Sequence, residues 1–269
     1  MRMKSSIISL LLVIGLAAHS FAAEPYGIVV GGVTVTSDNA SNIADGSKVN
    51  LRGNISYDPA TNTLTLHDAT IEIIEPGDYP SIINYGIDVD RDELNICLKG
   101  HNVVFGTLIG ILAKNITFCG QGFLNAGGQG DGMMANSICI TDGCSVSCES
   151  VNICLSTRNL VVDGSTLTLM NPGASTLHEF TDLQRVELVN CGIIAPTTGV
   201  YYHSDLHTLT DDGNIHNNVV IGPVTSGVPD IAAGNRHCGT GAVFTIGGTR
   251  VSTPERGIYI NNGKLIFNP

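Results

Sequence analysis

A repeat of 22 residues is the feature of this sequence that most restricts its fold. Apolar residues recur in steps of 22 in two columns, at Leu94, Ile116, Ile138 and Leu160 and, two residues on, at Ile96, Phe118, Ile140 and Val162. A third column steps by 24, 22 and 22, with glycine directly before its first three members, at Ile87, Ile111, Met133 and Leu155. A fixed period of this length is typical of solenoids, in which each repeat packs only on its neighbours.

Turn signals between the columns divide each repeat into short strands. Glycine-containing pairs that bend the chain follow the first two columns, at Lys99-Gly100, Asp142-Gly143 and Asp163-Gly164. Apolar and polar residues alternate on both sides of the turn, which predicts two strands per repeat and a third near Ile87. We therefore predict an all-β fold, a single-stranded right-handed parallel β-helix with about 22 residues per coil. The glycines before the third column predict a tight corner.

The ends of the chain differ from this repeat. Residues 1–22 carry Arg2 and Lys4, an apolar run at Ile7–Ala18 and a small-residue end at Ala22, the layout of a signal peptide that export would remove. The predicted organisation of the remainder is an N-terminal cap at 23–59, the parallel β-helix at 60–222, a linker at 223–242 and a small C-terminal β segment at 243–269. We therefore expect an exported protein, extracellular or on the outer cell surface, with the periplasm as the alternative.

The net negative charge of the chain limits which molecules it can bind. Removing Arg2 and Lys4 leaves 11 basic against 24 acidic residues, so the expected mature chain carries a net charge of -13. Such a field repels phosphate backbones and anionic lipid, which argues against nucleic acid as a partner. No segment after the signal peptide predicts membrane insertion.

Eight cysteines follow the signal peptide and would meet an oxidising compartment after export. Strand parity places Cys97 beside Cys119 in an outward column, and leaves open whether these two form a disulfide. The same parity predicts that Cys144 and Cys148 are thiols of the core. The cysteine spacing lacks the paired geometry of zinc ribbons.

Two segments offer candidate binding residues. Alternation places the carboxylates of Asp88, Asp90 and Asp92 near one corner, where they are weak candidates for calcium ligands; a solvated corner is the alternative, because the spacing is not that of an EF-hand. The segment at Tyr201, Tyr202 and His203 combines aromatic faces with a ring nitrogen, which suits ligand binding; a polar edge of the last coils is the alternative. No cofactor is predicted.

Two stretches resemble known families. The segment at Gly31–Ala40, followed by Ile55–Leu66, resembles the opening of secreted gut-bacterial β-helix proteins of the Bacteroidetes type, commonly labelled carbohydrate-binding domain proteins, and the likeness covers about residues 26–222. The run at Val243–Lys264 resembles the C-terminal sorting segments of type-nine secretion. The first resemblance implies a β-helix fold and glycan contact. The second implies a partner in the secretion machinery; a small β cap is the alternative.

These observations favour a non-catalytic β-helix that binds glycans or cell-surface components. A polysaccharide lyase or glycoside hydrolase is one alternative, although no predicted column stacks two acidic residues as such chemistry requires. A purely structural surface protein is the other. The chain has no tryptophan and only 5% aromatic residues, so the sequence predicts no obvious platform for stacking sugars.

Overall fold

The computed structural model describes residues 23–44, 50–73, 84–170, 180–181, 183–195, 201–203, 208–210, 218–224, 243–245, 250–251, 257–261 and 264–268. The chain divides into two compact units, Met1–Val224 and Thr225–Pro269, and each is treated by itself. The predicted signal peptide and most of the predicted linker lie outside the described residues. In the part of the chain that the structure describes, every element is a strand, and no helix long and apolar enough to cross a membrane is found.

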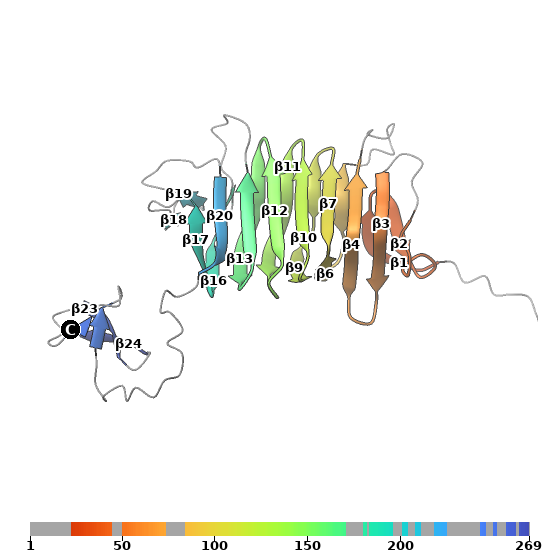
Figure 1. The fold of residues 1–269 in the computed structure, drawn as a ribbon. Helices are drawn as coiled ribbons and strands as arrows, with labels where there is room; N and C mark the ends of the chain where they lie inside the picture. The colour runs from red at the N-terminus through yellow and green to blue at the C-terminus, as the bar shows by residue number, and fades with distance from the viewer. Residues whose placement is uncertain are drawn as a thin grey trace, which may run out of the picture. The chain divides into compact units, whose positions relative to one another are not determined.

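The first unit is a right-handed parallel β-helix of about 4 turns whose coils are about 22 residues apart, as the repeat predicts (Figure 1). Each coil has three sides. The first side is formed by β4 (Thr63–Glu72), β6 (Leu94–Lys99), β9 (Asn115–Gly120), β11 (Asp131–Ile140), β13 (Ile153–Asp163) and β16 (Arg185–Val189). These strands pair in parallel from one coil to the next.

The other two sides are built in the same way. The second side contains the end of β4, then β7 (His101–Gly106), β10 (Phe123–Gly128), β12 (Ser145–Ser150) and β14 (Thr166–Met170). The third side contains β5 (Tyr85–Val89), β8 (Ile109–Leu112), the starts of β11 and β13, and β15 (Phe180–Thr181). The long strands β4, β11 and β13 therefore each continue around a corner.

The three apolar columns of the repeat fill the interior. Ile96 pairs with Phe118, Phe118 with Ile140 and Ile140 with Val162, and all four side chains are fully buried. The columns that begin at Leu94 and Ile87 are buried in the same way. One continuous core results, because each coil covers the apolar face that its neighbour would otherwise expose to water.

The glycines before the third column lie near the start of strands of the third side, next to the corner with the second side, where the sequence predicts a tight corner. Gly86 belongs to β5 and Gly110 to β8. A Cβ at Gly86 would lie 2.7 Å from the Gly110 carbonyl oxygen, and one at Gly110 would lie 2.6 Å from the Gly132 carbonyl oxygen. Glycine is needed here because the backbones of successive coils approach too closely for a side chain.

Antiparallel strands close both ends of the helix. β1 (Pro25–Val30) pairs antiparallel with β2 (Val33–Thr36) and β5, and β3 (Asn50–Asp58) pairs antiparallel with β4. At the other end, β20 (Asn218–Pro223) runs antiparallel between β14 and β17 (Cys191–Ala195). Among the described residues, the last parallel pairing along the first side joins β13 to β16. An antiparallel last strand covers backbone groups that a further coil would otherwise pair.

The remaining strands are short. β18 (Tyr201–His203) and β19 (Thr208–Thr210) form an antiparallel hairpin. The second unit is an antiparallel sheet of β21 (Val243–Thr245), β22 (Arg250–Val251), β23 (Gly257–Asn261) and β24 (Lys264–Asn268). The segment that resembles a sorting signal therefore forms β-structure, as both interpretations of it expect.

Candidate functional site

The outward face of the first side carries small polar side chains in register. Thr63, Asn95, Thr117 and Cys139 follow one another from coil to coil in one column. Their inward neighbours, such as Ile96 and Phe118, are buried, so parity turns this column to the surface. Groups that donate and accept hydrogen bonds therefore recur at the spacing of the coils, roughly 4.8 Å.

A polar groove lies along this face and the corner that leads to it. One hollow of about 350 Å³ is lined by Glu93, Leu94, Asn95, Asn115, Ile116, Thr117, Ser137 and Cys139. A second, of about 590 Å³, is lined by Asn62, Asp90, Arg91, Asp92, Glu93 and Lys114. The two hollows share Glu93, and we call them together the corner groove.

Side-chain amides hold the groove in place by bonding to the backbone of a neighbouring coil. The Nδ2 of Asn115 donates to the Asp92 carbonyl oxygen at 2.6 Å, and the Nδ2 of Asn62 donates to the Glu93 carbonyl oxygen at 2.7 Å. Asn95 makes a longer bond of the same kind, 3.3 Å to the Thr61 carbonyl oxygen. These bonds fix the planes of the amides, so the groove presents them in an ordered arrangement.

The acidic run of the sequence lies at the charged end of this groove. Lys114 Nζ lies 3.1 Å from Asp92 Oδ1 and 4.0 Å from Asp90 Oδ1. Asp88 is on the third side, where burial, followed by repulsion from Asp90, raises the pKa of its carboxyl. Among the described residues, no three His, Cys, Asp or Glu side chains form a group suited to a metal ion. The structure thus gathers Asp90 and Asp92 around a lysine, and the calcium hypothesis stays a prediction.

Arg91 joins the charged end of the groove to the N-terminal cap. Its Nη1 donates to the Tyr26 carbonyl oxygen at 3.0 Å, and its guanidinium lies 5.9 Å from the centre of the Tyr57 ring. The Tyr57 hydroxyl in turn donates to Asn62 Oδ1 at 2.9 Å. Burial raises the pKa of Tyr57, although Arg91 opposes this. The cap is therefore part of the groove's support, a role that spacing in the sequence did not indicate.

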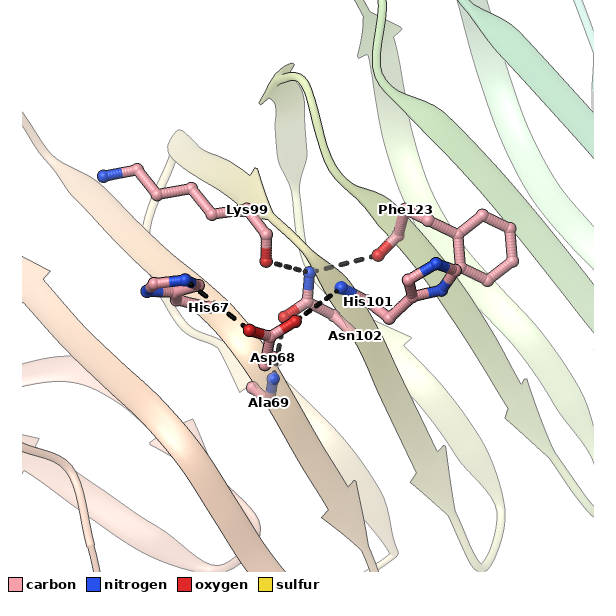
Figure 2. Close-up of polar contacts among 7 residues, drawn as sticks. All are labelled: His67, Asp68, Ala69, Lys99, His101, Asn102 and Phe123. Atoms are coloured by element: carbon pink, nitrogen blue, oxygen red, sulfur yellow. Dashed lines mark hydrogen bonds and ion pairs between the residues drawn. The ribbon is translucent and has the colours of Figure 1, made fainter.

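A buried amide organises the corner between the first and second sides (Figure 2). Asn102 is fully buried and connects three coils. Its Oδ1 accepts from the Ala69 N–H at 2.9 Å, and its Nδ2 donates to the carbonyl oxygens of Lys99 at 3.1 Å and Phe123 at 3.0 Å. Asp68 lies beside it, and its Oδ1 accepts from the His101 N–H at 2.9 Å. We call this arrangement the polar corner.

Rings gather on the outward face of the second side, next to the polar corner. His101 and Phe123 pack against each other with ring centres 5.4 Å apart, as Figure 2 shows. Phe105, from the same strand as His101, reaches over Gly127 of the next coil, where a Cβ would lie 2.6 Å from its Cζ. The low number of aromatic residues in the sequence does not indicate this platform, because its rings come together only through the register of the coils.

Two polar atoms next to these rings have no hydrogen-bond partner. Asn125 lies two residues after Phe123 and pairs with Ser147 of the next coil. Asn125 Oδ1 and Ser147 Oγ are the buried side-chain polar atoms without a partner in the described part of the chain, and Ser147 is only 4% exposed. We call His101, Phe105, Phe123, Asn125 and Ser147 the ring strip. Alternation of outward residues on β7 and β10 is the signal that would have found it.

The cysteines are free thiols throughout the described residues. Cys97 and Cys119 pair in register on the outward face, as predicted, and burial together with the neighbouring Cys97 raises the pKa of Cys119 to about 11. Cys144 and Cys148 are fully buried, which confirms that they belong to the core. Such thiols are poor nucleophiles, because reactivity requires the thiolate.

The candidate residues Tyr201, Tyr202 and His203 form β18, but their side chains lie outside the described residues. In the backbone register, Tyr201 pairs with Thr210 and His203 with Thr208. Their proposed role in ligand binding therefore stays a prediction. Neither the corner groove nor the ring strip includes them.

Comparison of the chain with protein-family models, with curated proteins and with solved structures yields no match. The corner groove and the ring strip are therefore the basis for proposing a function.

Proposed function

We propose that this protein is a non-catalytic β-helix that binds glycans through the corner groove. The observation that supports this proposal is the groove itself, in which amide and hydroxyl side chains from three successive coils line one open hollow. A glycan offers hydroxyl groups at regular intervals along its length. Ordered amides such as Asn95 and Asn115 are suited to such groups because each amide both donates and accepts.

The carboxylates of the groove support binding over bond cleavage. Glycoside hydrolysis uses one carboxyl kept protonated by a buried setting and another that stays ionised. Asp90 and Asp92 are instead 92% and 91% exposed, and both lie close to the ammonium group of Lys114. Carboxylates in this setting accept hydrogen bonds from a ligand but are not arranged as a proton-donating acid.

We propose further that the protein acts outside the cell or on its outer surface. The signal-peptide pattern of residues 1–22 supports export, and the resemblance of Val243–Lys264 to type-nine sorting segments supports a contact with that secretion machinery. Expression in a Bacteroidetes host with and without residues 243–269 tests this. Retention of the truncated chain in the periplasm is the expected result, and equal amounts in the medium would count against it.

The binding proposal is tested on a glycan array with the chain lacking residues 1–22. A double variant, Asn95→Ala with Thr117→Ala, should lose the binding that the unaltered protein shows. The matched control is Met134→Ala with Ser156→Ala, which alters an outward column of the third side and should bind normally. Binding that survives the groove variant would contradict the proposal. A reducing-sugar assay on the bound glycans should show no turnover.

A further inference from the structure

The ring strip has the two properties that a site for a sugar ring requires. Phe123 and Phe105 are half-buried and lie on either side of Asn125 along the outward face, because Phe105 occupies the space above Gly127. Aromatic faces of this kind pack against the C–H faces of a sugar. His101, whose ring packs beside Phe123 at a tilt of 48°, adds an exposed ring that carries a donor and an acceptor.

The unpartnered atoms of the strip point to a ligand. Asn125 Oδ1 and Ser147 Oγ are adjacent in register, are shielded from water and have no hydrogen-bond partner. A buried polar group in this state destabilises the fold until a partner reaches it. A ligand whose hydroxyl groups reached both atoms would remove this penalty.

From this geometry we infer that the ring strip is a second glycan site, separate from the corner groove. Its ligand is a glycan of pyranose rings with equatorial hydroxyl groups, such as a β-1,4-linked glucan or xylan. Such rings present flat C–H faces to Phe105 and Phe123 and direct hydroxyl groups sideways, toward Asn125 Oδ1 and Ser147 Oγ. Axial hydroxyl groups would interrupt the face that contacts the aromatic rings.

The two sites lie on different sides of each coil. The groove follows β6 and β9 on the first side and the corner that precedes them, whereas the strip follows β7, β10 and β12 on the second side. This inference rests on the proposed function, because it extends glycan binding from one surface to two. A protein with two such sites can cross-link long glycan chains, since each site can hold a different chain.

The absence of tryptophan from the sequence makes a direct test possible. The variant Phe123→Trp keeps an aromatic face in the strip and makes it the only tryptophan fluorophore of the chain. We expect cellohexaose or xylohexaose to change its emission in a saturable way. Leu112→Trp is the matched control, since it places tryptophan on the outward face of the third side. No change in Phe123→Trp at millimolar sugar, or an equal change in the control, would overturn the inference.

Stoichiometry separates this inference from the proposed function. Calorimetry with the responding hexasaccharide should give two sites in the unaltered protein and one in Phe123→Ala, whose remaining site keeps its affinity. The groove variant with Asn95→Ala and Thr117→Ala should also keep one site, and its loss of a site supports the proposed function. If only groove substitutions remove binding, the strip is not a site. If only substitutions in the ring strip remove binding, the ring strip is a glycan site and the proposal for the corner groove is wrong.

Discussion

Two corners of the same coil hold the backbone together by opposite means. At the polar corner, between the first and second sides, the buried side chain of Asn102 makes hydrogen bonds to three coils. At the next corner, between the second and third sides, Gly106, Gly110, Gly128 and Gly132 come together, and we call this the glycine corner. The polar corner is stabilised by the hydrogen bonds of one amide side chain. The glycine corner is possible only because glycine has no side chain.

The two corners differ in the side chains that they require. At the glycine corner, a Cβ on Gly110 would lie 2.6 Å from the carbonyl oxygens of both Gly127 and Gly132. At the polar corner, the chain turns through Gly100 with a positive φ of 65°, and the buried Ala69 N–H is bonded to the Asn102 side chain. The polar corner therefore needs a polar side chain to satisfy a buried backbone group, whereas the glycine corner needs residues without a side chain.

The largest effect that we predict is at the glycine corner. Gly110→Ala should lower the free energy of unfolding by about 3 kcal/mol or more, because the added methyl group meets backbone atoms of two neighbouring strands that cannot rotate away. The midpoint of urea unfolding, followed by far-ultraviolet circular dichroism, measures this.

The control is Leu112→Ala, two residues further along β8 on the outward face. It removes apolar volume from the surface and should cost less than about 1 kcal/mol. Equal effects of the two substitutions would show that the glycine corner is not as crowded as the structure indicates.

Much of the helix could be predicted from the sequence because burial in a solenoid repeats. The columns that begin at Leu94, Ile96 and Ile87 gave the register of the first and third sides, and parity placed Cys144 and Cys148 in the core. The antiparallel ends could not be predicted in this way, because β1, β3 and β20 do not repeat. Their pairing depends on which strand edges the coils leave open.

The candidate sites were harder to predict, because they depend on outward residues from different coils. Nothing in the local sequence of Phe105 shows that its ring lies over Gly127, since that contact is set by the register between coils. Asn102 is an exception, because the sequence shows a polar residue 22 positions before the apolar residue Leu124, its register partner on the next coil. A polar residue in a buried apolar column needs hydrogen-bond partners, and the corner supplies them.

The second prediction tests the polar corner. Asn102→Ala should lower the free energy of unfolding by about 2 kcal/mol, because it leaves the buried Ala69 N–H without an acceptor. The same urea measurement applies. The comparison predicts a smaller loss here than for Gly110→Ala, because the polar corner loses bonds without gaining a clash.

Asn125→Ala is the matched control for this substitution, since it removes an amide from the same side, one coil further on. Asn125 Oδ1 has no partner, so its removal should leave stability unchanged or slightly raised. A loss as large as that of Asn102→Ala would mean that Asn125 has a structural role, which would also weaken its assignment to the ring strip.

The smallest predicted effect concerns the carboxylates near the two corners. Asp68, at the polar corner, accepts a 2.9 Å hydrogen bond from the His101 N–H, whereas burial raises the pKa of Asp88, two residues after Gly86, above its usual value of 3.8. A raised carboxyl pKa means that the folded state binds its proton more tightly than the unfolded state. Stability from this group is therefore present at low pH and is lost as the pH rises through the folded-state pKa.

Asp88→Asn should accordingly stabilise the protein by about 0.5 kcal/mol at pH 7 and have no effect at pH 3, where the unaltered carboxyl is protonated in both states.

Asp58→Asn provides the opposite case, because hydrogen bonds from Thr61 and the Ala60 N–H lower the pKa of Asp58. Its substitution should destabilise the protein at pH 7, and this effect should shrink as the pH falls through the folded-state pKa of Asp58. If Asp88→Asn stabilises the protein equally at both pH values, the effect does not come from the charge of the Asp88 carboxylate, and the prediction is wrong.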